Sequence, residues 1–373
     1  MAKIKSVSVI IPLFRRTAYI EDILKLDTKL AQDLEFILVI DNPKQDFIKW
    51  VKEKAQNSKK KIEVLVNEKN IGASKSRNKG IENAKGDLIL FLDDDVIPEK
   101  KLIDYHIVEI EKSETFGVIG TTIMNFDKNK KIQYAIGKAG FDYSFRLYRD
   151  YKKHSWGPTC NISFLKEKIR DNRFDDCYPK AGGGEDVDFC WDIGSREEQS
   201  KMIVSETAKA IHPPWAGIKS IYKRINRWGY ADAILFTKQP ERRYIDWPNY
   251  PEANILLLIS SIILGAVLNP WLFLQIPIHI IFSFVLTGFY QTYDSKSDLL
   301  TGQIIQSLRI WHHMGRIKQI LLSFRFHRFF YRTQYFDSHT PKKIRRKTFT
   351  EFLLILFSYF ITILGTLLLI YLR

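Results

Sequence analysis

Residues 67–95 read NEKNIGASKSRNKGIENAKGDLILFLDDD. Within this stretch, 74–84 has a helical pattern, and 88–92 is an apolar run with the length of a strand. Three consecutive aspartates follow that run. Adjacent carboxylates at the end of an apolar strand are electrostatically costly unless a cation neutralises them. The stretch therefore predicts a helix, a strand and an acidic site, in that order.

The same alternation extends toward the N-terminus. Further strand-like runs lie at 7–12, 36–40 and 62–66. Helical patterns between them lie at 19–32 and 47–58. Strands that alternate with helices predict an α/β fold with a mostly parallel, doubly wound sheet. Ligands of such sheets bind at the carboxyl ends of the strands, which is where Pro12, Asp41 and the three aspartates fall.

The aspartates at 93–95 allow two interpretations. A divalent cation such as Mg²⁺ or Mn²⁺ prefers oxygen ligands and keeps positions open for a substrate phosphate. The alternative is a solvated acidic turn after a strand. The place of the block after the fourth strand-like run favours the metal and phosphate site.

A second acidic cluster follows a run of glycines, since 182–189 reads GGGEDVDF. Glycines permit close approach of the backbone to a ligand, and Glu185, Asp186 and Asp188 come directly after them. A carboxylate in this position can take a proton from an incoming hydroxyl. The alternative is a loop with an N-capping Asp before a helix at 187–193.

Together these motifs resemble those of the family 2 glycosyltransferases, which have the GT-A fold. The block 67–95 is similar to the stretch that leads into the DxD motif of that family. The residues at its N-x-G-x-(x)-x-x-R-N-x-G pattern are Asn70, Gly72, Ala73, Arg77, Asn78 and Gly80. The opening VSVIIP run and Asp41 also match, and the resemblance covers about the first 215 residues. One departure is Asp-Asn-Pro-Lys at 41–44, where the family often has Asp-Asp-Gly-Ser, and this leaves the nucleotide base open.

The resemblance implies a donor site. Asp41 is expected to contact the nucleotide base, and Asp93 and Asp94 are expected near the ribose. Asp95 is expected to ligate a divalent metal, Mn²⁺ or Mg²⁺, on the donor diphosphate, with Asp93 and His212 as candidate further ligands. The other residues expected in the nucleotide-sugar site are Pro12, Asn70, Arg77 and Arg227.

The resemblance also implies an acceptor side at Glu185 and Asp186, with Asp186 as the catalytic base. One base suffices for a single direct displacement, which inverts the anomeric carbon. A metal on the diphosphate would stabilise the leaving group.

Two of these residues have equally simple structural interpretations. His212 lies in IHPPW and either ligates the metal or is a structural histidine before two prolines. Arg227 lies in RINRW, which is similar to the QxxRW motif of processive polysaccharide synthases except that Arg224 replaces the glutamine. Arg227 is expected to meet the diphosphate, an acceptor phosphate or lipid headgroups.

The C-terminal part of the chain has long apolar runs. Residues 254–290 are almost wholly apolar, with an interruption at Asn269-Pro270, and are long enough for two short membrane spans or a re-entrant hairpin. Residues 352–372 form a cleaner span. Between them, 301–335 alternates basic with apolar and aromatic residues, which is typical of a helix in the membrane interface. A buried hairpin of a soluble protein is the alternative for 254–290.

Charge supports a membrane surface as the partner of this part. Residues 216–373 contain 20 Lys or Arg against 8 Asp or Glu, whereas the first 215 residues are nearly balanced. This excess suits anionic lipids better than nucleic acid. The basic cluster at 342–347 predicts that 1–253 and 291–348 are cytoplasmic, with Arg373 outside the cell membrane. The three cysteines, which have no metal-ligand spacing, fit a reducing cytosol.

The predicted organisation is a GT-A domain and four membrane-associated segments. The boundaries are 1–215 for the catalytic domain, 216–253 for an amphipathic segment, 254–290 for a membrane hairpin, 291–348 for basic interfacial helices and 349–373 for a transmembrane helix.

The predicted function is transfer of a sugar from a nucleotide donor to a lipid-linked or membrane-proximal glycan acceptor. The alternatives are a processive polysaccharide synthase, a non-catalytic membrane adaptor on a degenerate transferase fold, and a nucleotidyltransferase. The last would need a glycine-rich phosphate loop near the first strand, and the segment 14–17 contains no glycine.

Overall fold

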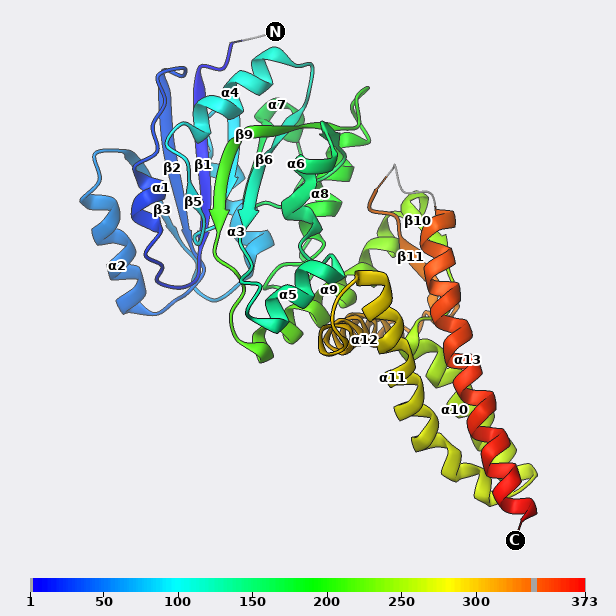
Figure 1. The fold of residues 1–373 in the computed structure, drawn as a ribbon. Helices are drawn as coiled ribbons and strands as arrows, with labels where there is room; N and C mark the ends of the chain where they lie inside the picture. The colour runs from blue at the N-terminus through cyan, green and yellow to red at the C-terminus, as the bar shows by residue number, and fades with distance from the viewer. Residues whose placement is uncertain (1–2, 337–340, 373) are drawn as a thin grey trace. The chain divides into compact units, whose positions relative to one another are not determined.

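The computed structural model describes residues 3–336 and 341–372 (Figure 1). The chain divides into two compact units. The first unit comprises Met1–Asn125 and Asp142–Pro214, and the second comprises Phe126–Phe141 and Trp215–Arg373.

The first unit is built on a sheet that has nine strands within the described residues. Four of them pair in parallel in the order β3-β2-β1-β4. Their bounds are Ser6–Leu13 for β1, Asp33–Ile40 for β2, Lys61–Val66 for β3 and Leu88–Leu92 for β4. The predicted parallel half of the sheet is confirmed, and its carboxyl ends gather the polar residues that follow these strands.

The other half of the sheet was not predicted from the sequence. Strand β8 (Asn161–Leu165) lies antiparallel between β4 and β6 (Gly117–Met124), and β9 (Met202–His212) runs parallel to β6. Two short strands, β5 (Ile97–Pro98) and β7 (Lys153–His154), pair antiparallel with β9. The sheet is therefore mixed, and β9 ends at His212 on the side of the acidic block.

Helices of the first unit lie between these strands. Their bounds are Ile20–Leu24 for α1, Gln45–Gln56 for α2, Ala73–Asn83 for α3, Leu102–Lys112 for α4, Leu147–Asp150 for α6, Lys166–Ile169 for α7 and Glu185–Gly194 for α8. The helix expected over 19–32 ends at Leu24. Asp27 Oδ1 accepts from the Thr28 N–H, and the Thr28 hydroxyl donates to Asp104. Such local side-chain bonds compete with helix formation.

Helix α3 lies unusually close to the sheet. A Cβ added to Gly80 would lie 2.4 Å from Ile10 Cγ2, so only glycine fits there without a shift of the core. Close packing of α3 on β1 brings Arg77, one turn before Gly80, to the ends of the parallel strands.

The second unit contains α5 (Lys131–Ala139), α9 (Ile218–Lys238) and α12 (Leu299–Leu322). Helices α9 and α12 cross where each presents a glycine to the backbone of the other. A Cβ added to Gly229 would lie 1.7 Å from His312 O, and one added to Gly315 would lie 1.9 Å from Asn226 O. Helix α9 lies within the segment 216–253 that the sequence predicts to be amphipathic.

Three helices in the described part of the chain are long and apolar enough to cross a membrane. They belong to α10 (Tyr250–Val267), to η3 (Pro270–Leu274) continued by α11 (Gln275–Ser295), and to α13 (Pro341–Tyr371). Asn269 caps the break between the first two by accepting a hydrogen bond from the Trp271 N–H. The basic cluster 342–347 lies in the first turns of α13, and Arg373 lies outside the described residues.

Helix α11 carries a buried polar row within its apolar sequence. The row consists of Gln275, His279, Ser283, Thr287 and Gln291. The Gln275 amide donates to Ser261, and His279 Nδ1 lies 3.1 Å from the Ser358 hydroxyl. The four-residue spacing places all five side chains on one helix face, so α11 contributes a polar stripe to the buried interior, beside the apolar cluster around Tyr250, Ala253 and Ile355.

A buried ion cluster fixes the start of α10. Glu252, which is fully buried, pairs with both Arg316 of α12 and Arg332 of β11 (Tyr331–Thr333). Strand β11 pairs in turn with β10 (Arg243–Ile245). The first apolar helix is thereby attached to α12 and β11 through ion pairs.

Candidate functional site

The acidic block after β4 is bound to the loop after β1. The Phe14 N–H donates to Asp94 Oδ2 at 3.4 Å, and the Thr17 hydroxyl donates to Asp94 O at 2.6 Å. Asp94 is buried, and this burial, followed by the negative charges of Asp95 and Asp93, raises its pKa to about 7. Strands β1 and β4 pair in parallel, which is why the loop and the block meet at the same edge.

Asp95 lies between a cation and an imidazole. Its Oδ2 is 2.5 Å from the Arg15 guanidinium, and its Oδ1 is 3.4 Å from His212 Nε2. His212 Nδ1 lies 2.7 Å from Pro213 O, and because a carbonyl only accepts, Nδ1 carries a proton. In the neutral ring, the lone pair of Nε2 then faces a carboxylate oxygen. Two acceptors that converge in this way can ligate one cation.

Arg77 joins the two acidic motifs. Its Nη2 donates to Asp93 at 3.0 Å and its Nη1 donates to Glu185 at 3.3 Å. Its guanidinium also lies 5.6 Å from the centre of the Phe174 ring, which stacks on Phe189. Arg77 is only 4% exposed, and its pair with the buried Glu185 is shielded from water. The structure thus brings the predicted donor and acceptor motifs together through one side chain.

The three glycines before α8 have conformations that other residues rarely adopt. The φ angles of Gly182, Gly183 and Gly184 are 81°, 133° and 88°. In this turn the Glu185 side chain folds back along the chain, and its carboxylate accepts a hydrogen bond from the Gly183 N–H. Glu185 is buried and its oxygens are occupied by that N–H and by Arg77.

Asp186 is less buried than Glu185. Its Oδ1 accepts from the Val187 N–H at 2.9 Å, and Gly184, rather than an aspartate, is the N-cap of α8. Burial, together with the negative charge of Glu185, raises the pKa of Asp186 although Arg77 opposes the shift. A raised pKa suits a group that must accept a proton near neutral pH.

Asp41 organises the turn before α3. Its Oδ1 accepts from the Ile71 N–H at 2.8 Å and from the Asn67 amide at 3.1 Å, and its Oδ2 accepts from the Gly72 N–H at 2.9 Å. Asp41 is 5% exposed. The shape of the edge where a base is expected therefore depends on this carboxylate.

The remaining predicted residues lie in different places. Pro12 is in the last part of β1, opposite Val39 of β2. Asn70 is exposed and directly precedes the Ile71-Gly72 segment that Asp41 binds. Arg227 lies on α9 and so belongs to the second unit.

Two residues of this edge were missed by sequence reasoning. Arg15 pairs with Asp95, and Asn67 supports both Asp41 and Ser76. A signal for Arg15 existed, because a basic pair directly follows β1 and the acidic block ends the neighbouring parallel strand. Nothing in the sequence around Asn67 distinguishes it from a solvated loop residue.

Residues 8–173 match the family model described as glycosyl transferase family 2. The chain carries a family 2 glycosyltransferase domain. The match begins in β1 and includes the acidic block, and Glu185 and Asp186 lie shortly beyond it.

Curated relatives of this family 2 domain match over part of their length. An uncharacterised glycosyltransferase of Methanocaldococcus jannaschii is 29% identical over 112 residues, which cover 30% of this chain and 39% of that protein. The undecaprenyl-phosphate 4-deoxy-4-formamido-L-arabinose transferase of Proteus mirabilis is 29% identical over 167 residues, covering 41% of this chain and 50% of that protein. The chain thus spans half or less of these relatives.

A solved structure supports the fold over most of the chain. The mannosyltransferase of Pyrobaculum calidifontis in complex with GDP-Man and Mn²⁺ has a TM-score of 0.54 at 13% identity, covering 85% of this chain and 88% of that one. The predicted GT-A fold is confirmed.

Proposed function

We propose that the chain is an inverting glycosyltransferase that moves a sugar from a nucleotide donor to a lipid-linked or membrane-proximal acceptor, with help from a divalent metal. The observation that carries this proposal is Arg77, which holds Asp93 of the donor motif and Glu185 of the acceptor motif within hydrogen-bonding distance of one guanidinium. A donor bound at the first motif would have its anomeric carbon close to the carboxylates of the second.

The donor atoms around Asp95 suit Mn²⁺ or Mg²⁺. Among the described residues, no group of three or more His, Cys, Asp or Glu side chains forms a closed metal site. A catalytic cation bound through a nucleotide diphosphate needs few protein ligands, because phosphate oxygens and water complete its shell. Asp95 and His212 would hold the metal, with Asp93 beside them, and the metal would neutralise charge on the departing diphosphate. Mn²⁺ in the similar mannosyltransferase supports this proposal.

The chain's own residues divide the remaining work. Asp186 takes the proton from the attacking hydroxyl, since its pKa is raised and its side chain is half-buried. Glu185 acts as a positioning residue, because its oxygens are occupied by Arg77 and the Gly183 N–H. Displacement from the side opposite the leaving diphosphate gives inversion in one step.

The acceptor class is inferred from two observations. The Proteus mirabilis relative is named an undecaprenyl-phosphate 4-deoxy-4-formamido-L-arabinose transferase, and three helices in the described part of this chain are long and apolar enough to cross a membrane. A basic cluster at 342–347, at the start of α13, supports a cytoplasmic catalytic domain by the positive-inside rule.

The test is a thermal-shift panel on the full chain in detergent. UDP-, GDP- and dTDP-sugars are added with Mn²⁺, with Mg²⁺ or with EDTA. We expect one donor class to raise the melting temperature only in the presence of metal, and Asp95→Asn to remove that shift.

The matched control is Asp171→Asn, which removes an exposed carboxylate paired with Arg196. This variant should respond to donor like the natural chain. Donor-dependent stabilisation that persists in Asp95→Asn with full metal dependence would exclude the proposed metal site.

A further inference from the structure

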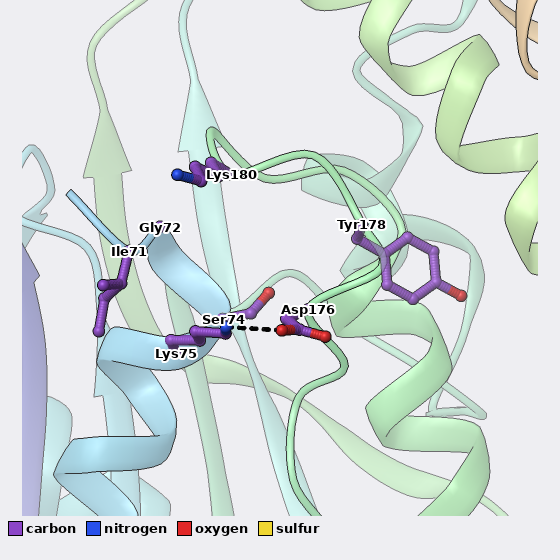
Figure 2. Close-up of a pocket in the computed structure, with 7 residues that line it drawn as sticks. All are labelled: Ile71, Gly72, Ser74, Lys75, Asp176, Tyr178 and Lys180. Atoms are coloured by element: carbon purple, nitrogen blue, oxygen red, sulfur yellow. Dashed lines mark ion pairs between the residues drawn. The ribbon is translucent and has the colours of Figure 1, made fainter.

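A pocket of about 130 Å³ lies in the first unit, between the first turn of α3 and the segment 176–180 (Figure 2). The polar side chains that line it are Ser74, Lys75, Asp176, Tyr178 and Lys180. None of the residues proposed for donor, metal or proton transfer is among its lining residues. The space is well above the roughly 10–15 Å³ that holds one water molecule, so a polyatomic ligand has room.

The first turn of α3 leaves two backbone donors at this pocket. The Gly72 N–H donates to Asp41, and the Ala73 N–H donates to Lys180 O at 3.0 Å. The helical ladder begins with the Ser76 N–H, which donates to Gly72 O. The N–H groups of Ser74 and Lys75 therefore have no acceptor among the described residues. They lie at the positive end of the helix dipole.

The Ser74 hydroxyl is a third donor without a partner. Ser74 is 7% exposed, lines the pocket, and forms no hydrogen bond with any residue that the structure describes. Figure 2 shows its oxygen at the N-terminal end of α3, facing the space between the helix and the 176–180 segment. The side chain is held in place by its surroundings while its oxygen opens to the pocket, so it is available to donate to a ligand atom there.

The charges around the pocket favour an anion. Lys75 pairs with Asp176 at 2.6 Å, and both side chains are about half exposed. Lys180 Nζ donates to the neutral Asn70 O at 3.2 Å and has no carboxylate within ion-pair distance in the described chain. One positive charge of the pocket lining therefore has no carboxylate partner among the described residues.

We propose that this pocket binds an oxyanion of the phosphate class. The backbone N–H groups of Ser74 and Lys75 and the Ser74 hydroxyl bind its oxygens, as helix N-termini do in other phosphate sites. Lys180 supplies the compensating charge, and Lys75 turns from Asp176 to the anion. Because Lys180 directly precedes the 181–184 turn, a bound anion would fix the approach to Glu185 against α3.

The proposal goes beyond the transferase function and does not depend on it. Its test is isothermal titration of the full chain in detergent with sodium phosphate, in EDTA and at constant ionic strength, against sodium chloride. We expect saturable phosphate binding. Ser74→Ala should weaken it by at least about tenfold, the cost of one hydrogen bond to a charged group. Asp176→Asn should tighten it, because Lys75 is then free to bind the anion.

The control is Lys52→Gln on α2, which removes an exposed positive charge of the same unit. It should leave phosphate affinity unchanged. Equal heats with phosphate and chloride, or equal losses in Ser74→Ala and Lys52→Gln, would mean an adventitious ion only and overturn the proposal. If Ser74→Ala does not fold, an unchanged affinity in Asp176→Asn has the same force.

A competition arm distinguishes the sources of the phosphate. Farnesyl phosphate that displaces inorganic phosphate from the natural chain, and not from Ser74→Ala, assigns the site to a lipid phosphate monoester. Inorganic phosphate binding that farnesyl phosphate leaves intact assigns it to the free anion.

Discussion

Arg77 is expected to stabilise the first unit more than any surface cation, and Arg77→Met tests this. The substitution keeps the length and apolar contacts of the side chain but removes the charge shared by Asp93 and Glu185. The side chain of Glu185 is 4% exposed and that of Asp93 is 33% exposed. Removing one partner of a buried ion pair costs about 3–5 kcal/mol. The partly exposed pair with Asp93 adds little to this.

For a unit of this size, each kcal/mol shifts the melting temperature by about 2–4 °C. Arg77→Met should therefore lower the melting temperature by roughly 6–20 °C in a tryptophan-fluorescence melt of the full chain in detergent. Most of the loss arises because Glu185 is left buried and charged. Adding Glu185→Gln to Arg77→Met should recover at least half of it.

Arg196→Met is the matched control, because Arg196 pairs with Asp171 on the surface. It should leave the melting temperature unchanged within error. A melting temperature of Arg77→Met within about 2 °C of that of the natural chain, or a double variant no more stable than the single one, would contradict this role of Arg77.

The remaining predictions concern the base, the helix crossing and the topology. Asp186→Asn should keep the donor-dependent thermal shift and lose transfer by at least about 10²-fold; a normal rate would exclude Asp186 as the base. The pKa of Asp186 is raised, so its protonation should reduce the donor-saturated rate at a pH higher than that at which ordinary carboxylates are protonated. Glu185→Gln removes a negative charge that raises this pKa, so the loss of rate should move to lower pH. An unmoved profile in a folded variant would contradict this. Gly229→Ala should reduce the yield of folded chain in detergent, since its Cβ would lie 1.7 Å from His312 O, whereas Gly365→Ala, which meets no atom within 4 Å, should not. In a cysteine-free background, an external thiol reagent should label a cysteine at 269 and not at 343, and labelling at 343 would reverse the proposed orientation.

The parallel half of the fold could be predicted because its strands are short apolar runs separated by helical patterns. The antiparallel half could not be predicted, because β6 contains two glycines and β9 mixes lysine and glutamate with apolar residues. Strand β6 joins the parallel half through β8, and β9 joins it through β6; β8 lies more than 30 residues from either along the chain. Apolar content alone does not identify such strands.

The acidic motifs of the site were visible in the sequence, but the side chains that hold them were not. The resemblance pointed to Arg77, yet its two carboxylate partners lie 16 and 108 residues away. The partners of Asp41 depend equally on the fold, since they come from the turn before α3. Sequence reasoning therefore predicted which groups carry charge, and the structure adds which charges oppose one another.

The polar row of α11 makes the order of synthesis important for this chain. Five residues at four-residue spacing extend about 24 Å along a helix, which is most of the roughly 30 Å hydrocarbon core of a bilayer. Two of their partners, Ser358 and Glu351, belong to α13, which the ribosome makes after α11. Until α13 inserts, the row has to be shielded by α10 or by the insertion machinery. Defects in α13 should therefore reduce how much protein survives cellular quality control, even where they leave the chemistry of the first unit untouched.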